Sequence, residues 1–309
     1  MPVPKLAILV PTNSVGPLPT SAEYARFFSR AEELGFHSLW VIDRLAHERV
    51  NMLAPLTIAT WAAALTSRIE IGLGVLLANL WGSPVAIAKQ LASLDVLSGG
   101  RLWAGVSLGG RPEEYQAVGV PISQRLGRMI ELIEIARKVW REDHVSFSGK
   151  YYQFEDITLN PKPVREGGLP LIIGTGAPDG VRRAGRIGDG WIIGAAPGPD
   201  VIRQGYERFA EGARSVGKDP ASMEVIKELY TYVDSNEQVA WDHLTPYCHG
   251  YYGPQWDVEA NTAAGPPEKI VERIKALGEA GVTTVLLGPP RPDVEQLELI
   301  ANEVAPALA

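Results

Sequence analysis

The alternation of short, β-branched apolar runs with longer amphipathic segments is the feature that most constrains the fold of this chain. An alternation of this kind is typical of strand-helix units that build a parallel sheet. Eight such units predict an α/β protein with a closed (β/α)8 TIM barrel. The expected strands cover residues 6–10, 38–42, 69–76, 102–106, 169–173, 190–193, 223–233 and 283–287.

The segments between these runs carry apolar residues at helical spacing and predict eight helices. We expect them over residues 22–34, 53–65, 85–97, 125–140, 179–187, 200–216, 267–280 and 293–304. Residues 142–168 depart from the pattern and predict a hairpin that turns at Gly149, followed by an extended loop. Residues 243–267 crowd aromatic rings among glycines and prolines, which predicts an irregular loop that either closes over a ligand or packs onto the barrel. We therefore expect one domain over residues 1–309, with insertions at about 142–168 and 243–267.

Composition excludes several classes of function. The formal net charge of −7 and the absence of a basic run disfavour a nucleic-acid partner. Cys248 is the only cysteine, so neither an intramolecular disulfide nor a Cys-rich zinc site can form. The sequence contains no His-Glu-x-x-His motif, and we expect no metal. Without a recognisable signal peptide or an apolar run of membrane-spanning length, we expect a cytoplasmic protein with no membrane partner.

Glycines follow three of the expected strands, at the barrel end where active sites form. Gly109 and Gly110 follow the strand at 102–106, and Arg111 adds a positive charge that could meet an anion. The run Gly174, Thr175, Gly176, Ala177 leads into the helix expected at 179–187, and the free amides of a helix start suit a phosphate group. Gly194 follows the neighbouring strand. We predict a cofactor site at this end of the barrel.

Polar side chains follow the first two strands. Thr12 and Asn13 either line a substrate pocket or form hydrogen bonds to the backbone of their own turn. Asp43, Arg44 and His47 follow the second strand, and His47 is either a catalytic residue or a surface histidine.

Four motifs occur in an order that resembles the bacterial luciferase-like family of flavin- and deazaflavin-dependent oxidoreductases. They are SGGRL at 98–102, PKP at 161–163, IIGTG at 172–176 and GRIGDGW at 185–191. The resemblance spans nearly the whole chain and implies a TIM barrel with an active site at the carboxyl ends of its strands.

The resemblance also assigns roles to particular residues. Many members carry Asp-His where this chain has Asp43-Arg44, and the resemblance implies that this histidine positions or protonates the reacting partner. Here either Arg44 substitutes for it as a cationic hydrogen-bond donor or His47 takes its role. A cis peptide beneath the flavin ring is implied at Gly74-Val75, and Asn79 is implied near the polar edge of the ring.

The chain departs from the family again at Gly109 and Gly110, which stand where some deazaflavin-dependent dehydrogenases have a glutamate. Arg111, Glu113 and Glu114 are the candidates to compensate for that loss, and the alternative for Glu113 and Glu114 is the solvated first turn of a helix.

From the resemblance we expect a flavin-dependent monooxygenase that uses O2 and reduced FMN, supplied by a separate flavin reductase, on a small organic substrate. The alternative is an F420-dependent hydride-transfer oxidoreductase. The acidic tail of F420 would need basic partners, for which the candidates are Arg111, Arg182, Arg183 and Arg186. A second alternative is a flavin-binding barrel without catalysis. An aldolase is disfavoured because no buried strand lysine stands out. The resemblance implies a homodimer, for which residues 61–65 are a candidate surface.

Overall fold

Eight parallel strands close into a barrel in the computed structural model, which describes residues 3–308. Each strand pairs with the next in chain order, and the last pairs with the first, which confirms the predicted TIM barrel. The strands are β1 (Lys5–Leu9), β3 (Ser38–Val41), β5 (Glu70–Leu76), β6 (Leu102–Ser107), β9 (Leu171–Gly174), β10 (Gly190–Ile193), β11 (Glu224–Val233) and β13 (Thr284–Gly288).

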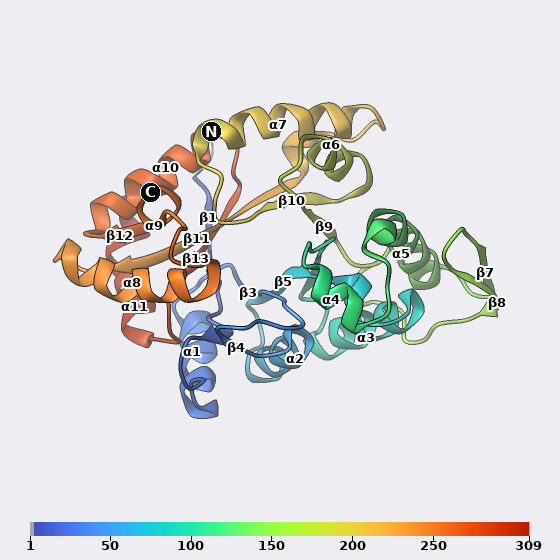
Figure 1. The fold of residues 1–309 in the computed structure, drawn as a ribbon, viewed down its shortest axis with the longest axis horizontal. Helices are drawn as coiled ribbons and strands as arrows, with labels where there is room; N and C mark the ends of the chain where they lie inside the picture. The colour runs from blue at the N-terminus through green and yellow to red at the C-terminus, as the bar shows by residue number, and fades with distance from the viewer. Residues whose placement is uncertain (1–2, 309) are drawn as a thin grey trace.

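One helix follows each barrel strand and packs outside the sheet (Figure 1). All eight predicted helices are present: α1 (Ser21–Glu33), α2 (Pro55–Leu65), α3 (Pro84–Ser98), α5 (Arg125–Arg141), α6 (Pro178–Ile187), α7 (Pro199–Arg214), α10 (Pro267–Glu279) and α11 (Val294–Leu299). Five of them begin at a proline, whose fixed φ suits the first helical position. The last helix is shorter than predicted because Ile300–Val304 forms a π-helical turn.

Most of the core lies in two parts, one inside the barrel and one between the strands and the helices. Along β11, Ile226 and Tyr230 face the interior, while Val225 and Leu229 face the helices. Trp40 on β3 is the largest side chain in the interior. A Cβ atom at Gly72 on β5 would lie 2.1 Å from the Trp40 ring, so this position must be glycine.

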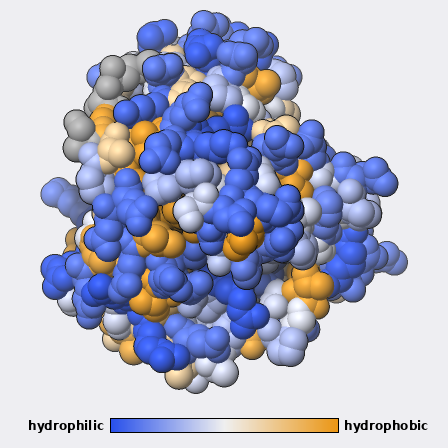
Figure 2. Space-filling view, turned by 90° about the vertical axis from the view of Figure 1, so that its left-hand side faces the viewer, coloured by the Kyte–Doolittle hydropathy of each residue, from blue (hydrophilic) through white to orange (hydrophobic). Residues whose placement is uncertain are grey.

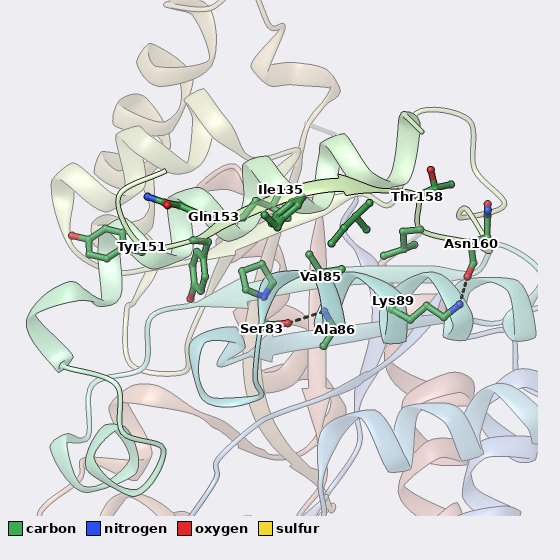
Figure 3. Close-up of a pocket in the computed structure, with 14 residues that line it drawn as sticks. Ser83, Val85, Ala86, Lys89, Ile135, Tyr151, Gln153, Thr158 and Asn160 are labelled. Carbon is green, nitrogen blue, oxygen red and sulfur yellow. Dashed lines mark hydrogen bonds between the residues drawn. The ribbon is translucent and has the colours of Figure 1, made fainter. Parts of the chain in front are cut away.

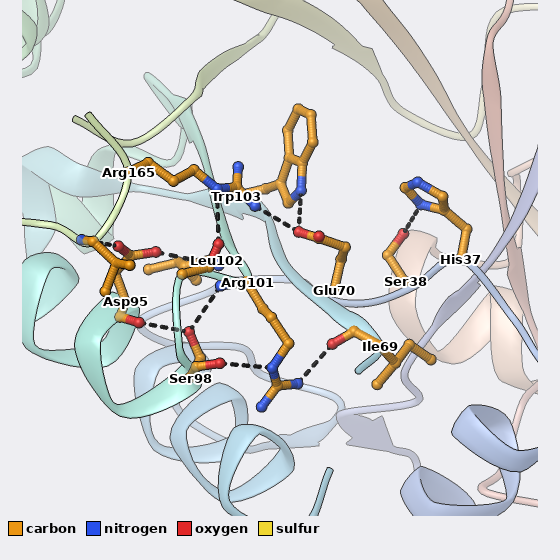
Figure 4. Close-up of polar contacts among 12 residues, drawn as sticks. His37, Ser38, Ile69, Glu70, Asp95, Ser98, Arg101, Leu102, Trp103 and Arg165 are labelled. Carbon is orange, nitrogen blue, oxygen red and sulfur yellow. Dashed lines mark hydrogen bonds and ion pairs between the residues drawn. The ribbon is translucent and has the colours of Figure 1, made fainter. Parts of the chain in front are cut away.

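The SGGRL motif forms the turn between α3 and β6, at the amino-terminal end of the strands. Gly99 ends α3 with a φ of 71°. The buried Arg101 guanidinium donates hydrogen bonds to the backbone carbonyls of Ala63, Thr66, Ile69 and Ser98 and to Thr66 Oγ1. Figure 4 shows Arg101 between Ser98 and Ile69, with Glu70, Trp103 and Arg165 in a neighbouring polar group. Arg101 therefore joins the end of α2 to the α3–β6 turn.

The first insertion is the predicted hairpin. Strands β7 (Val145–Ser148) and β8 (Gln153–Ile157) pair antiparallel, and the turn begins at Gly149, whose amide donates to the Tyr152 carbonyl. In Figure 1 the hairpin lies at the right-hand edge, beyond α5, on the opposite side of the molecule from α8.

The second insertion is not the irregular loop that the sequence predicted. Helix α8 (Glu237–Tyr252) continues through Pro246 and is followed by α9 (Val258–Asn261) and the short strand β12 (Ala263–Gly265), which pairs with the end of β11. Tyr247, Cys248 and Tyr251 of α8 are buried against the interior cluster of the barrel. This burial outweighs the hydrogen bond that Pro246 removes.

Three short elements complete the chain. Strands β2 (Asn13–Ser14) and β4 (Asn51–Met52) pair antiparallel, and α4 (Pro112–Ala117) follows β6. Figure 2 shows the side of the molecule where α8, α10 and α11 lie, and hydrophilic residues predominate there, with hydrophobic residues in small separate groups. Within residues 3–308, none of the helices combines the length and apolar character needed to cross a lipid bilayer.

Candidate active site

A cavity of about 370 Å³ opens at the carboxyl ends of the strands, the end at which TIM barrels carry their active sites. Its walls come from the segments that follow β3, β5, β6, β9 and β10, from β11 and from α8. Eight of the predicted site residues line it: Asp43, Arg44, Gly74, Val75, Gly109, Thr175, Gly176 and Gly194. The peptide bond between Gly74 and Val75 is cis, as the resemblance implied.

Six predicted site residues do not line this cavity: His47, Asn79, Gly110, Arg111, Gly174 and Ala177. His47 stacks on Tyr251, with 5.2 Å between ring centroids, and Arg111 lies 3.3 Å from its Nε2 atom. Asn79 is buried beneath α4 and donates to the Arg125 carbonyl. The proposed roles of these residues stay predictions.

Thr12 and Asn13 are also absent from the cavity wall. Both are buried, and Asn13 Oδ1 accepts a hydrogen bond of 2.5 Å from the Tyr247 hydroxyl. Asn13 therefore joins α8 to the segment after β1, while the Thr12 hydroxyl has no hydrogen-bond partner among the described residues.

Arg44 lies at the rim, in a network that joins three segments. Its Nη1 atom is 3.3 Å from Glu114 Oε2, and its Nε atom donates to the Tyr251 hydroxyl at 3.3 Å. Glu114 also accepts from the amides of Leu45 and Ala46. The expectation that Glu114 belongs to a solvated helical turn is wrong, because its side chain is completely buried, whereas Glu113 is exposed.

Asp43 is buried beside the cis peptide segment. Its Oδ2 atom accepts hydrogen bonds from the Leu77 amide at 2.8 Å and from Trp81 Nε1 at 2.6 Å. Its Oδ1 atom has no partner among the described residues. Burial raises the pKa of Asp43 to about 6. The carboxyl group can therefore exchange a proton near neutral pH.

Glu228 on β11 is a cavity residue that the sequence reasoning missed. Its half-buried carboxylate lines the cavity and has no hydrogen bond or ion pair with a described residue. Burial raises the pKa of Glu228. The alternation of Ile226, Glu228 and Tyr230 on one face of a strand was the signal that could have found it.

Lys227, its neighbour, corrects the expectation that no buried strand lysine is present. Its side chain is buried, and its Nζ atom donates to the carbonyls of Gly194, Ala195 and Glu228. Lys227 does not line the cavity, so it holds the segment after β10 in place instead of facing a substrate.

The glycine segments after β9 and β10 leave room at the mouth. A Cβ atom at Gly176 would contact nothing within 4 Å, and one at Gly194 would meet only Glu228 Oε2, at 4.0 Å. The residue before α6, Ala177, provides no side-chain cap, so the amides of the first turn remain free. This arrangement can accept an anionic group of a cofactor.

A larger cavity, of about 790 Å³, lies outside the barrel between α3, α5 and the β7–β8 hairpin (Figure 3). Its walls include Val85, Ile135 and Tyr151, and Lys89 donates to the Asn160 carbonyl at one end. None of the predicted site residues lines it. The cavity at the barrel mouth is therefore the candidate active site.

The fold and this site define a TIM-barrel enzyme whose cavity lies at the carboxyl ends of the barrel strands. Residues 6–284 match the family described as luciferase-like monooxygenase, and the chain belongs to that family. It is 29% identical to the F420-dependent glucose-6-phosphate dehydrogenase of Segniliparus rotundus, over 93% of each chain. It is 28% identical to the F420-dependent hydroxymycolic acid dehydrogenase of Mycobacterium tuberculosis, over 90% of this chain and 82% of the relative.

The solved structure of monooxygenase RslO1 from Streptomyces bottropensis superimposes with a TM-score of 0.88 at 24% identity, covering 99% of this chain and 100% of that one. At this identity the likeness supports the fold alone. The fold and the relatives make the chain an enzyme of the oxidoreductase type.

These comparisons correct the expected reaction. The sequence predicted a monooxygenase that uses reduced FMN from a separate reductase, but the relatives that span most of the chain are named F420-dependent dehydrogenases. The expectation erred because the family motifs lie in the barrel framework, as Arg101 does, and are shared by enzymes of different chemistry.

Proposed function

We propose that this protein is an F420-dependent oxidoreductase that transfers a hydride between F420 and a hydroxyl-bearing carbon of a small substrate. The observation that carries the proposal is the mouth of the barrel, where Gly176, Gly194 and the uncapped start of α6 leave space and free amides beside the cavity. The names of the relatives support F420 as the cofactor.

The residues at the mouth fit a cofactor that has a flat ring and an acidic tail. The cavity volume is near the lower end of the range for small-molecule sites, roughly 300–1,000 Å³, so it suits the ring while the tail extends outward. Gly74 and Gly109 would lie against the ring, and Thr175 and Gly176 near the first phosphate. F420 would supply a ring carbon that accepts or donates the hydride.

Aromatic residues of this chain would enclose the reacting groups. Tyr230, Tyr251 and Tyr252 line the cavity, and Tyr252 contacts each of the other two rings edge to face. Their rings exclude water from the substrate space, which favours hydride transfer over loss of the hydride to solvent. Arg44 fixes Tyr251 through the hydrogen bond to its hydroxyl.

The charges in the cavity favour an uncharged substrate. Among the residues that line it, Arg44 is the one cation, and it is already paired with Glu114. Asp43 and Glu228 add carboxyl groups to the same wall. Once the cofactor phosphate occupies the free amides at the start of α6, a second phosphate, on the substrate, would meet these carboxylates without a free cation. We therefore expect glucose 6-phosphate to be a poor substrate and an uncharged alcohol a better one.

A titration of the purified protein tests the cofactor. The fluorescence of its eight tryptophans would be followed during addition of F420 or of FMN, each oxidised and reduced. We expect F420 to bind at least about tenfold more tightly than FMN, a difference of about 1.4 kcal/mol. Tighter binding of FMN would contradict the proposal.

We also propose a cytoplasmic homodimer with a single folded domain per chain. The surface around Trp61 and Leu65 on α2 is our candidate contact, because Leu65 is exposed and Trp61 is half-buried. Light scattering would give the oligomeric state, and a polar substitution at Leu65 would weaken a dimer formed through this surface.

A further inference from the structure

We propose that Glu228 accepts the proton of the substrate hydroxyl during hydride transfer. This inference rests on the proposed function. As the alcohol is oxidised, the O–H bond breaks and its proton goes to the Glu228 carboxylate. The C–H bond breaks with its electron pair passing to F420 as a hydride, and the carbon-oxygen double bond forms. In the reverse direction, neutral Glu228 returns the proton to the carbonyl oxygen.

The position of Glu228 suits this task. It lies on β11 between Ile226 and Tyr230, which both belong to the interior cluster, and Tyr230 is the one nearer the carboxyl end of the strand. Its carboxylate lines the cavity and approaches the glycine segment after β10, where Oε2 lies 4.0 Å from the site of a Cβ atom at Gly194. A substrate beside the glycine segment would therefore be within reach of this carboxylate.

The carboxylate is also free to react. Within residues 3–308 its oxygens accept no hydrogen bond and form no ion pair, in contrast to the carboxylates of Glu114 and Asp43. The Glu114 carboxylate pairs with Arg44 and accepts hydrogen bonds from two backbone amides. In Asp43, Oδ2 accepts hydrogen bonds from Leu77 and Trp81, and Oδ1 is buried without a partner among the described residues. Glu228 is thus the carboxylate with both oxygens available to a ligand.

The surroundings set the protonation of Glu228 near neutral pH. Burial is the largest influence and raises its pKa, while the positive charges of Lys227 and Arg44 oppose that rise. A base with a pKa near the working pH is the most effective acceptor of a proton. The titratable and charged groups nearest to it are Lys227 and Tyr230 on β11 itself, and Arg44, Asp43, Tyr247, Tyr251 and Tyr252 from the elements packed against that strand.

The tyrosines of the cavity are poorer candidates for the same role. Burial raises the pKa of Tyr230, Tyr251 and Tyr252 above the usual value, so their hydroxyls remain protonated at neutral pH. They can donate a hydrogen bond to the substrate oxygen, but they cannot accept its proton. Glu228 therefore acts as the base, and the tyrosines enclose the substrate.

The first test follows the carboxyl group directly. The full chain would be labelled at the glutamate side-chain carboxyl carbon, and NMR spectra would be recorded across pH without cofactor, with Glu228→Gln used to assign the signal. We expect Glu228 to titrate at least about one pH unit above an ordinary glutamate, whose pKa is about 4.3. Titration at the ordinary value would overturn the proposal.

The second test measures F420 binding and turnover in the same variants, with cyclohexanol as the uncharged alcohol. We expect Glu228→Gln to bind F420 within about twofold of the native protein and to oxidise the alcohol about a hundredfold more slowly, the usual effect of losing a general base. The native rate should rise with pH as Glu228 ionises, and the variant should lose this dependence. Added formate should partly restore the rate of Glu228→Ala.

Glu166→Gln, which removes an exposed carboxylate outside the cavity, is the matched control and should behave as the native protein. Native-like turnover and an unchanged pH profile in Glu228→Gln would overturn the role of Glu228. Failure of the native protein to bind F420 would instead contradict the proposed function. The two failures can be distinguished because the NMR titration of Glu228 is recorded without cofactor.

Discussion

Arg44 and Glu114 form an ion pair at the rim of the cavity, with 3.3 Å between Nη1 and Oε2 and with the glutamate side chain completely buried. Arg44 stands at the position where the resemblance implies a histidine. Because the charge of Arg44 is engaged by Glu114, Arg44 positions the α4 segment and Tyr251 and is not free to protonate a substrate.

Removing this arginine should destabilise the protein. We expect Arg44→Met to lower the free energy of unfolding by about 2–4 kcal/mol, because it leaves the buried Glu114 charge without its partner. Urea unfolding measures the change. The double variant Arg44→Met/Glu114→Gln should recover part of the loss, and Arg68→Met, at an exposed arginine on the α2–β5 turn, should have little effect. Equal losses in the single and double variants would contradict the coupling.

Asp43 should make stability depend on pH. Its pKa in the folded protein, about 6, exceeds the usual value of 3.8, so the folded state favours the neutral acid. This preference adds roughly 3 kcal/mol to the free energy of unfolding below about pH 4, and the added stability is lost as the pH rises through 6. Asp43→Asn retains an oxygen for Leu77 and Trp81 but cannot ionise. The stability of Asp43→Asn relative to the native protein should therefore rise between pH 4 and pH 7, and a constant difference would refute this assignment.

Arg101 should be required for stability and not for cofactor binding. A lysine has three donors where Arg101 makes five hydrogen bonds, so we expect Arg101→Lys to lower the free energy of unfolding by about 2–4 kcal/mol. Arg68→Lys is the control. F420 affinity measured on the folded fraction should be unchanged, because Arg101 lies at the other end of the barrel from the cavity. A large loss of affinity would show that the SGGRL turn acts on the site.

Gly194 and Gly198 offer a matched pair for testing the mouth of the barrel. A Cβ atom is accommodated at both, but Gly194 lines the cavity and Gly198 does not. We expect Gly194→Ala to keep the native melting temperature and to weaken F420 binding at least about tenfold, because the methyl group occupies cofactor space. Gly198→Ala should change neither. Native affinity in Gly194→Ala would mean that the cofactor does not approach this segment.

Local sequence patterns were sufficient to predict the barrel and the end of it that carries the cavity. The alternation of apolar runs with amphipathic segments located the eight strands and their helices to within a few residues, because each strand must bury its apolar faces wherever it lies. Glycines at strand ends, such as Gly176 and Gly194, pointed to the mouth because they leave backbone accessible. The Gly149 hairpin followed from its turn residues in the same way.

The course of α8 could not be predicted from the sequence. Pro246 and the nearby glycines are local signals for a loop, but the burial of Tyr247, Cys248 and Tyr251 against the interior cluster of the barrel outweighs them. Such burial depends on residues more than two hundred positions away, among them Asn13, which accepts the Tyr247 hydrogen bond.

The charges of the site were likewise decided by the tertiary structure. The sequence by itself determined which residues follow each strand, and hence the set from which a site can be built. Only the fold decided that Glu114 is buried against Arg44, that Asn79 is turned away from the cavity, and that Glu228 faces it without a partner. Burial and pairing set the protonation of a carboxylate, and both depend on neighbours that packing brings together from distant parts of the chain.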